Sequence, residues 1–281
     1  WKGNTYHPAW ERDKSGNCHR RRFMSVRLSV GNYETGFGVQ IWKNYEDGMR
    51  IFLRDPSGDA EFELLPIRGT DRIRIGETEL LIYYGEPSPF NAAQEIYIEF
   101  VPEQAYVESG IWIFRFLGKG REDTYVDLWL PSSAALGQNT AFLEPSPETT
   151  LTIPSTAFRP LTVGAYDSRT GIYAPFSGRG DTRIYHAQKP DLAAPGVGIM
   201  APKSGGGYEA VTGTSFAAPL VAGAAALLME WGIVRGNDPY LYGEKVKAYL
   251  RKGAKRLPSE LEYPNPRLGY GALCVSESIP E

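Results

Sequence analysis

A glycine, a threonine and a serine, Gly213 to Ser215, precede a long segment of small and apolar residues with no charge before Glu230. We expect a helix from Ser215 to about Glu230. A serine at the amino end of this helix would lie beside unpaired backbone N–H groups and the positive end of the helix dipole. Both stabilise an oxyanion that forms on an attacked carbonyl. The pattern favours acyl transfer with Ser215 as nucleophile. The alternative is a serine that only caps a buried helix.

The elements around this serine follow two different patterns. From about Arg21 to Pro131, short segments such as "GFGVQIWKN" and "QEIYIEFV" alternate apolar and polar residues between turns. Roughly eight such strands fit an antiparallel β-sandwich of jelly-roll type. Strands and helices alternate after a polar connector, Pro131 to Thr150, which predicts α/β architecture with a parallel sheet.

The predicted elements of this second part can be stated individually. "PLTVGAYD" and "GVGIMAP" predict buried strands, Tyr242 to Leu257 predicts a second helix, and "LGYGALCV" predicts a closing strand. We also expect Pro219 in the first helical turn, where its missing N–H costs little.

Composition excludes several classes of protein. A net charge of −3 argues against a dedicated nucleic-acid binder, and 42% hydrophobic residues are enough for a packed core. Two cysteines, Cys18 and Cys274, do not make a disulfide scaffold, and the sequence leaves their pairing open. We expect no membrane span, no cofactor and no nucleic-acid partner, and the sequence defines no metal site.

Four segments in order resemble the subtilisin-like serine proteases. "GTSFAAPLVAG" resembles the nucleophile motif, with Ser215 in the nucleophile position. "LTVGAYDSRTGIYAPFSGRG", "KPDLAAPGVGI" and "LGYGALCV" resemble three further motifs of the family. The resemblance implies a subtilisin-like parallel sheet and hydrolysis of polypeptides through an acyl-enzyme. Leu220 stands where many relatives carry histidine, a position that is not catalytic.

One branch of the family, which includes clostridial spore-germination proteases, inserts a jelly roll before the nucleophile. "LLMEWGIVRGN" and "YPNPRLGYG" resemble that branch. It implies three parts: 1–20, the end of the N-terminal catalytic-core segment; 21–131, the jelly roll; and 132–281, the C-terminal part of the catalytic domain. It also implies a bacterial protein, extracellular or spore-associated. Asn4 has the spacing of the oxyanion asparagine, although Thr5 and Tyr6 depart from the usual following residues.

A serine nucleophile needs a base and an orienting carboxylate. The family's "D-[ST]-G" and "HGT" segments do not occur in these 281 residues. Five His and Asp residues lie in other contexts: His7, His19, His186, Asp13 and Asp167. Asp191 is expected to hold a turn. We therefore expect the Asp and His on sequence preceding Trp1, so that this chain alone is incomplete and inactive, with an N-terminal segment of the same protease as partner.

That segment should also cover the helix. Phe216 to Met229 is apolar or small on all its faces, and such a helix is stable only when covered. Two other functions stay open. One is a catalytically inactive pseudoprotease that regulates or binds. The other makes the sandwich a carbohydrate- or protein-binding module. Its aromatic residues are expected in the core: Tyr83, Tyr84, Trp112 and Trp129.

Overall fold

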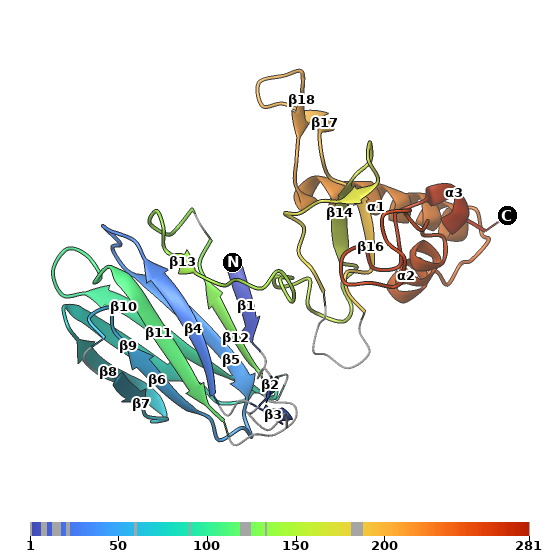
Figure 1. Ribbon diagram of the computed structural model, residues 1–281. Coiled ribbons are helices and arrows are strands. Elements are labelled where there is room, and N and C mark those ends of the chain that lie inside the picture. Colours follow the sequence, from blue (N-terminus) through green and yellow to red (C-terminus); the bar gives the residue numbers. More distant parts are fainter. Residues whose placement is uncertain are drawn as a thin grey trace. The chain divides into compact units, whose positions relative to one another are not determined.

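A computed structural model of the chain describes residues 2–6, 10–12, 18–20, 23–58, 61–89, 91–118, 125–132, 134–180 and 188–280. Before Met24 it describes the backbone alone. The chain divides into two compact units, Trp1–Pro147 and Glu148–Glu281 (Figure 1). Each unit has a hydrophobic core of its own.

The first unit consists of two antiparallel sheets. Its six-stranded sheet has the order β1-β12-β5-β10-β9-β8 and its five-stranded sheet the order β13-β4-β11-β6-β7. The strands of the larger sheet are β1 (Lys2–Tyr6), β5 (Phe37–Asn44), β8 (Gly69–Ile75), β9 (Thr78–Tyr84), β10 (Ala93–Pro102) and β12 (Val126–Leu130). Those of the smaller sheet are β4 (Phe23–Val30), β6 (Arg50–Arg54), β7 (Glu61–Leu64), β11 (Gly110–Leu117) and β13 (Ala141–Phe142). A separate hairpin pairs β2 (Trp10–Arg12) with β3 (Cys18–Arg20).

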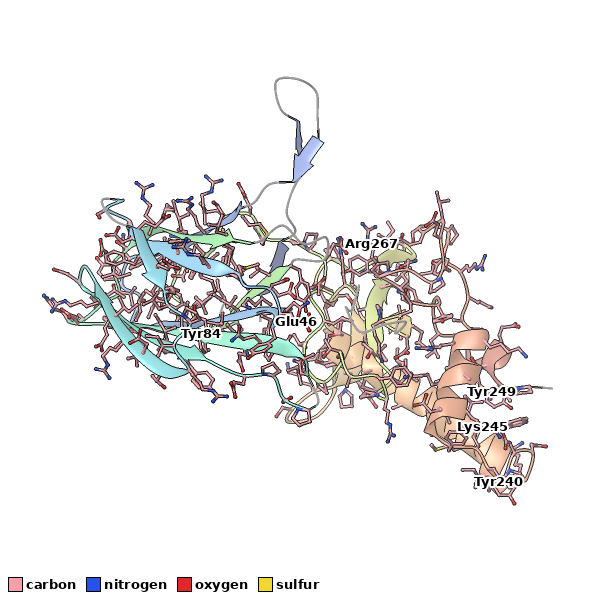
Figure 2. The ribbon with its side chains drawn as sticks, turned by 90° about the horizontal axis from the view of Figure 1, so that it is seen from below. Glu46, Tyr84, Tyr240, Lys245, Tyr249 and Arg267 are labelled. Atoms are coloured by element: carbon pink, nitrogen blue, oxygen red, sulfur yellow. The ribbon has the colours of Figure 1, made fainter. Side chains whose placement is uncertain are left out.

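Alternate residues of both sheets meet in one core, as the period-two pattern predicts. Phe100 contacts Trp112 edge to face, with ring centroids 5.2 Å apart. Tyr84 is also buried, and its hydroxyl donates a hydrogen bond to the carbonyl oxygen of Leu64 at 3.0 Å (Figure 2). Burial raises the pKa of the Tyr84 phenol. The expected core position is thus confirmed for Tyr84 and Trp112. Tyr83 is 46% exposed on the opposite face of its strand and Trp129 is only partly buried, so the core position expected for these two residues was wrong.

The connector after Pro131 packs largely on this first unit. The buried carboxylate of Glu34 accepts hydrogen bonds from the Gly137 N–H at 2.8 Å and the Thr140 hydroxyl at 2.6 Å. β13 adds Phe142 to the core. These contacts place the division between the units at Pro147, later than the boundary expected near Pro131. β1 also lies in this unit, paired with β12, although 1–20 was expected to belong to the catalytic core.

The second unit contains a small sheet in the order β15-β14-β16. β14 (Val163–Asp167) runs parallel to β16 (Leu192–Pro195) and antiparallel to β15 (Ile172–Tyr173). The helices are α1 (Thr214–Met229), its π-helical continuation η1 (Glu230–Val234), α2 (Gly243–Lys252) and α3 (Val275–Ser278). Lys245 lies on α2 (Figure 2). It forms an ion pair with Asp238 at 2.6 Å.

Three predicted elements differ from the structure. "GVGIMAP" was expected to be a buried strand, but it contains β17 (Ile199–Pro202), which forms a partly exposed hairpin with β18 (Tyr208–Val211). The buried strand is the preceding one, β16. "LGYGALCV" forms no strand: Ala272 makes isolated bridges to Ala193 and Lys255, and Gly269 makes one to Asn265. α2 ends at Lys252, before the expected Leu257, because the chain after Gly253 leaves the helix and Lys255 pairs with Ala272.

Candidate active site

Ser215 is the second residue of α1 and is exposed, as the Gly-Thr-Ser motif predicts. The helix begins after Gly213, whose N–H donates to the carbonyl oxygen of Gly196 at 2.8 Å. Gly196 directly follows β16. Ser215 therefore lies beside the carboxyl end of a parallel strand, where α/β folds place their ligands, and at the amino end of a long helix.

Small residues make this junction possible. A β-carbon added to Gly196 would come 2.7 Å from the Cβ of Ala165 on β14 and 3.5 Å from the Cβ of Ala217 on α1. Both alanines are fully buried. The close approach of helix and strands therefore depends on the absence of a side chain at Gly196, within the "APG" segment noted in the sequence.

The "FSGRG" segment supports β14 from its other side. The Ala165 N–H donates to the Ser177 hydroxyl at 3.0 Å, and the Ala174 N–H donates to the Ala165 carbonyl at 3.0 Å. The hydroxyl of Tyr173 donates to the Ser177 carbonyl. Ser177 thus holds β14 in place, which is a structural role. The motif resemblance alone did not assign a role to this serine.

Pro219 lies further along α1 than expected. It is the sixth residue of the helix, in the second turn, so its missing N–H is the one that would bond to the Ser215 carbonyl. The prediction that Pro219 belongs to the first turn was wrong. The effect of Pro219 is local: the backbone carbonyl of Ser215, the candidate nucleophile, lacks the N–H donor that residue 219 would otherwise supply.

Among the residues that the structure describes, one stripe of α1 is buried. Ala217, Val221, Ala224 and Leu228 are spaced for one face and pack in a core with β14 and β16. The other faces stay uncovered, with Leu220, Leu227 and Met229 each at least 40% exposed. Thr214–Val234 is also long and apolar enough to cross a membrane, a test that the core helices of soluble proteins pass equally well.

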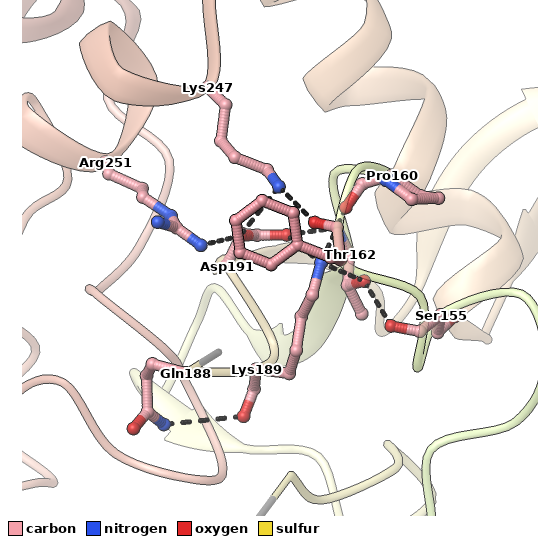
Figure 3. A network of polar contacts seen from close by, with 9 residues as sticks. Ser155, Pro160, Thr162, Gln188, Lys189, Asp191, Lys247 and Arg251 are labelled. Carbon is pink, nitrogen blue, oxygen red and sulfur yellow. Dashed lines mark hydrogen bonds and ion pairs between the residues drawn. The ribbon is translucent and has the colours of Figure 1, made fainter. Parts of the chain in front are cut away.

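Asp191 holds a network of buried charges (Figure 3). Its carboxylate is fully buried and accepts a hydrogen bond from the Thr162 N–H at 2.6 Å. Lys189 pairs with it at 2.8 Å, Lys247 at 3.7 Å, and Arg251 donates a further hydrogen bond. Burial lowers the pKa of the Lys247 ammonium. One carboxylate therefore joins β16 to α2, a structural role that agrees with the expectation for Asp191, although its three cationic partners were not foreseen.

The other residues considered from sequence fall into three groups, according to how far the structure describes them. His7, Asp13 and His186 lie outside the described residues, and His19 and Asn4 are described by backbone alone, in β3 and in β1 opposite Leu128. Asp167 forms an ion pair with Arg169, which is 76% exposed. Cys274 is a free cysteine. Among the described residues, no group of three or more His, Cys, Asp or Glu could hold a metal ion.

Comparisons with known proteins agree with this geometry. Residues 133–271 match the sequence model of the Subtilase family, Peptidase_S8. Serine protease AprX of Bacillus subtilis (strain 168) is 32% identical over 152 residues, which cover 47% of this chain and 32% of AprX. The Clostridium perfringens CspB protease structure has a TM-score of 0.84 and 34% identity, covering 99% of this chain and 55% of that one. Subtilisin-like protease SBT3.5 of Arabidopsis thaliana is 50% identical over 62 residues, 20% of this chain and 8% of the plant protein.

The second unit thus presents an exposed serine at the start of a helix that packs on two parallel strands. The sequence match is more specific, because residues 133–271 match the Subtilase family model and the chain shares the fold of the CspB protease structure. The chain covers less than two thirds of AprX and of the CspB structure.

We predict that Asp191→Asn lowers the free energy of unfolding by about 3–5 kcal/mol, because it leaves three cations without their buried carboxylate. Urea denaturation measures the change. The matched control is Glu230→Gln, which breaks the exposed pair with Arg235 and should cost less than about 1 kcal/mol. Similar losses in the two variants would contradict the role assigned to Asp191.

Proposed function

We propose that this chain is the nucleophile-bearing part of a subtilisin-like serine endopeptidase. The observation that carries the proposal is the position of Ser215, exposed in the first turn of α1 beside the carboxyl end of β16. The match of residues 133–271 to the Subtilase family supports it. AprX is named a serine protease and CspB a protease, which supports a polypeptide substrate for this chain as well.

In the proposed reaction, the Ser215 hydroxyl oxygen attacks the carbonyl carbon of the scissile peptide bond. A base accepts the hydroxyl proton and passes it to the departing amine. The first N–H groups of α1 stabilise the oxyanion while the tetrahedral intermediate forms. Collapse of that intermediate leaves an acyl group on Ser215, which water then hydrolyses.

The base and its carboxylate partner are proposed to come from polypeptide that precedes Trp1 in the full-length protein. Two observations support this: neither family segment that carries them occurs in the sequence, and most faces of α1 are uncovered. Asn4 is proposed as the side-chain donor to the oxyanion, on the basis of the Gly3–Asn4 pair. We also propose that the first unit is a jelly roll inserted into the protease, because the chain crosses repeatedly between its two sheets and the CspB similarity extends over both units.

We predict that Ser215→Ala in the full-length protein lowers peptide hydrolysis by several orders of magnitude, as loss of a triad member does. Steady-state hydrolysis of a denatured protein substrate measures it. Ser204→Ala, in the turn of the β17–β18 hairpin, is the control and should keep its activity. Near-normal turnover in Ser215→Ala would refute the assignment, and a full-length protein without turnover would favour a pseudoprotease.

We further predict opposite effects of Gly223→Ala in two contexts. Gly223 is exposed on α1, and an added β-carbon would meet nothing within 4 Å, so alanine should stabilise the isolated chain by up to about 1 kcal/mol. In the full-length protein the covering polypeptide should clash with that carbon and lower the melting temperature.

The control for this experiment is Gly243→Ala, at the exposed start of α2 with the same open surroundings. It should change the melting temperature in the same direction in both contexts. An equal rise in melting temperature for Gly223→Ala in the isolated chain and in the full-length protein would show that nothing packs closely on this face of α1.

A further inference from the structure

The outward face of the six-stranded sheet carries a straight row of side chains from neighbouring strands. Trp129 of β12 lies opposite Gln40 of β5, Gln40 opposite Tyr97 of β10, and Tyr97 opposite Tyr83 of β9. Neighbouring strands lie about 4.8 Å apart, so the row spans roughly 14 Å. Trp42 stands in the adjacent row. All of these residues are at least partly exposed.

Two glycines let the tyrosines of this row lie along the sheet. A β-carbon on Gly38 would come 2.1 Å from the hydroxyl oxygen of Tyr97, so this side chain rests directly on the Gly38 backbone. A β-carbon on Gly85 would come 3.4 Å from the ring of Tyr83. The Tyr97 hydroxyl is held further by a hydrogen bond to the Glu99 carboxylate. Burial, together with this contact, raises the pKa of Tyr97 to about 12.

Hydrogen-bonding groups lie between the rings. The Gln40 amide binds the Glu95 carboxylate, which stands opposite Trp42. Glu99 lies on the same face, two residues from Tyr97. Each carboxylate can accept further hydrogen bonds besides the one that it accepts here. The face thus alternates apolar ring surface with acceptor oxygens, whereas the opposite face of the same strands supplies mostly core residues.

We propose that this aromatic row binds a neutral polysaccharide laid across the strands. Pyranose rings present apolar C–H faces that pack on aromatic rings, while their hydroxyls donate to carboxylate and amide oxygens. The carboxylates Glu95 and Glu99 beside the rings disfavour an anionic polymer there, while Arg72 on the same face pairs with Glu79. A protein partner would require a broader apolar patch than a single row of rings separated by polar groups. The inference is independent of the peptide hydrolysis proposed for Ser215.

Isothermal titration calorimetry of the 281-residue chain with cellohexaose and chitohexaose tests the proposal. The chain should bind at least one of these neutral hexasaccharides, and Tyr83→Ala should weaken the binding about tenfold. Tyr106→Ala is the matched control. It removes a tyrosine of the same 46% exposure in the loop after β10, where the ring contacts Tyr33 instead of the row.

A second variant, Gly38→Ala, tests the positioning of the ring. The backbone of Gly38 has no left-handed φ, so alanine fits the strand and its β-carbon should displace only the Tyr97 ring. Binding should fall as far as in Tyr97→Ala, with an unchanged circular dichroism spectrum. The proposal is overturned if the chain binds neither hexasaccharide, if Tyr83→Ala and Tyr106→Ala have the same effect, or if a hyaluronate hexasaccharide binds more tightly than both neutral ones.

Discussion

The contact between Gly196, Ala165 and Ala217 decides where α1 begins, and the chemistry proposed for Ser215 depends on that position. A single added methyl group at Gly196 would come 2.7 Å from the Cβ of Ala165 and 3.1 Å from the Gly213 carbonyl oxygen, so β14 and the residue before α1 would have to shift. At the other end of β16, Asp191 ties the strand to its neighbour and to α2. Close packing and a buried charge network thus hold the same short strand from both ends.

The two units bury their hydrophobic residues in different ways. The first buries large aromatic and branched side chains between its two sheets, in one continuous core. The second packs one stripe of α1 on three short strands and leaves apolar side chains such as Leu227 exposed. Burying apolar surface is worth about 25 cal/mol per Å², so an uncovered helix of this length favours association with a further polypeptide.

Much of this organisation could be predicted from sequence, because alternation and small-residue helices are local signals. The strands of the first unit and the start of α1 beside Ser215 follow from such patterns. The exposed β17–β18 hairpin and the isolated pairing of Ala272 do not, since apolar composition does not reveal a strand's partner. Asp191 was assigned to a turn, whereas its contacts with Lys247 and Arg251 join residues far apart in sequence. The Gly38–Tyr97 contact depends likewise on register between strands.

The most direct test of the nucleophile assignment is fluorophosphonate labelling with mass-spectrometric mapping of the modified peptide. A fluorophosphonate reacts with a serine only when a base activates the hydroxyl and the oxyanion is stabilised. The 281-residue chain alone should stay unlabelled, and the same chain supplemented with the polypeptide that precedes it in the full-length protein should carry the adduct on Ser215. Labelling of the isolated chain at Ser215, or an adduct on another serine of the assembled protein, would contradict this account.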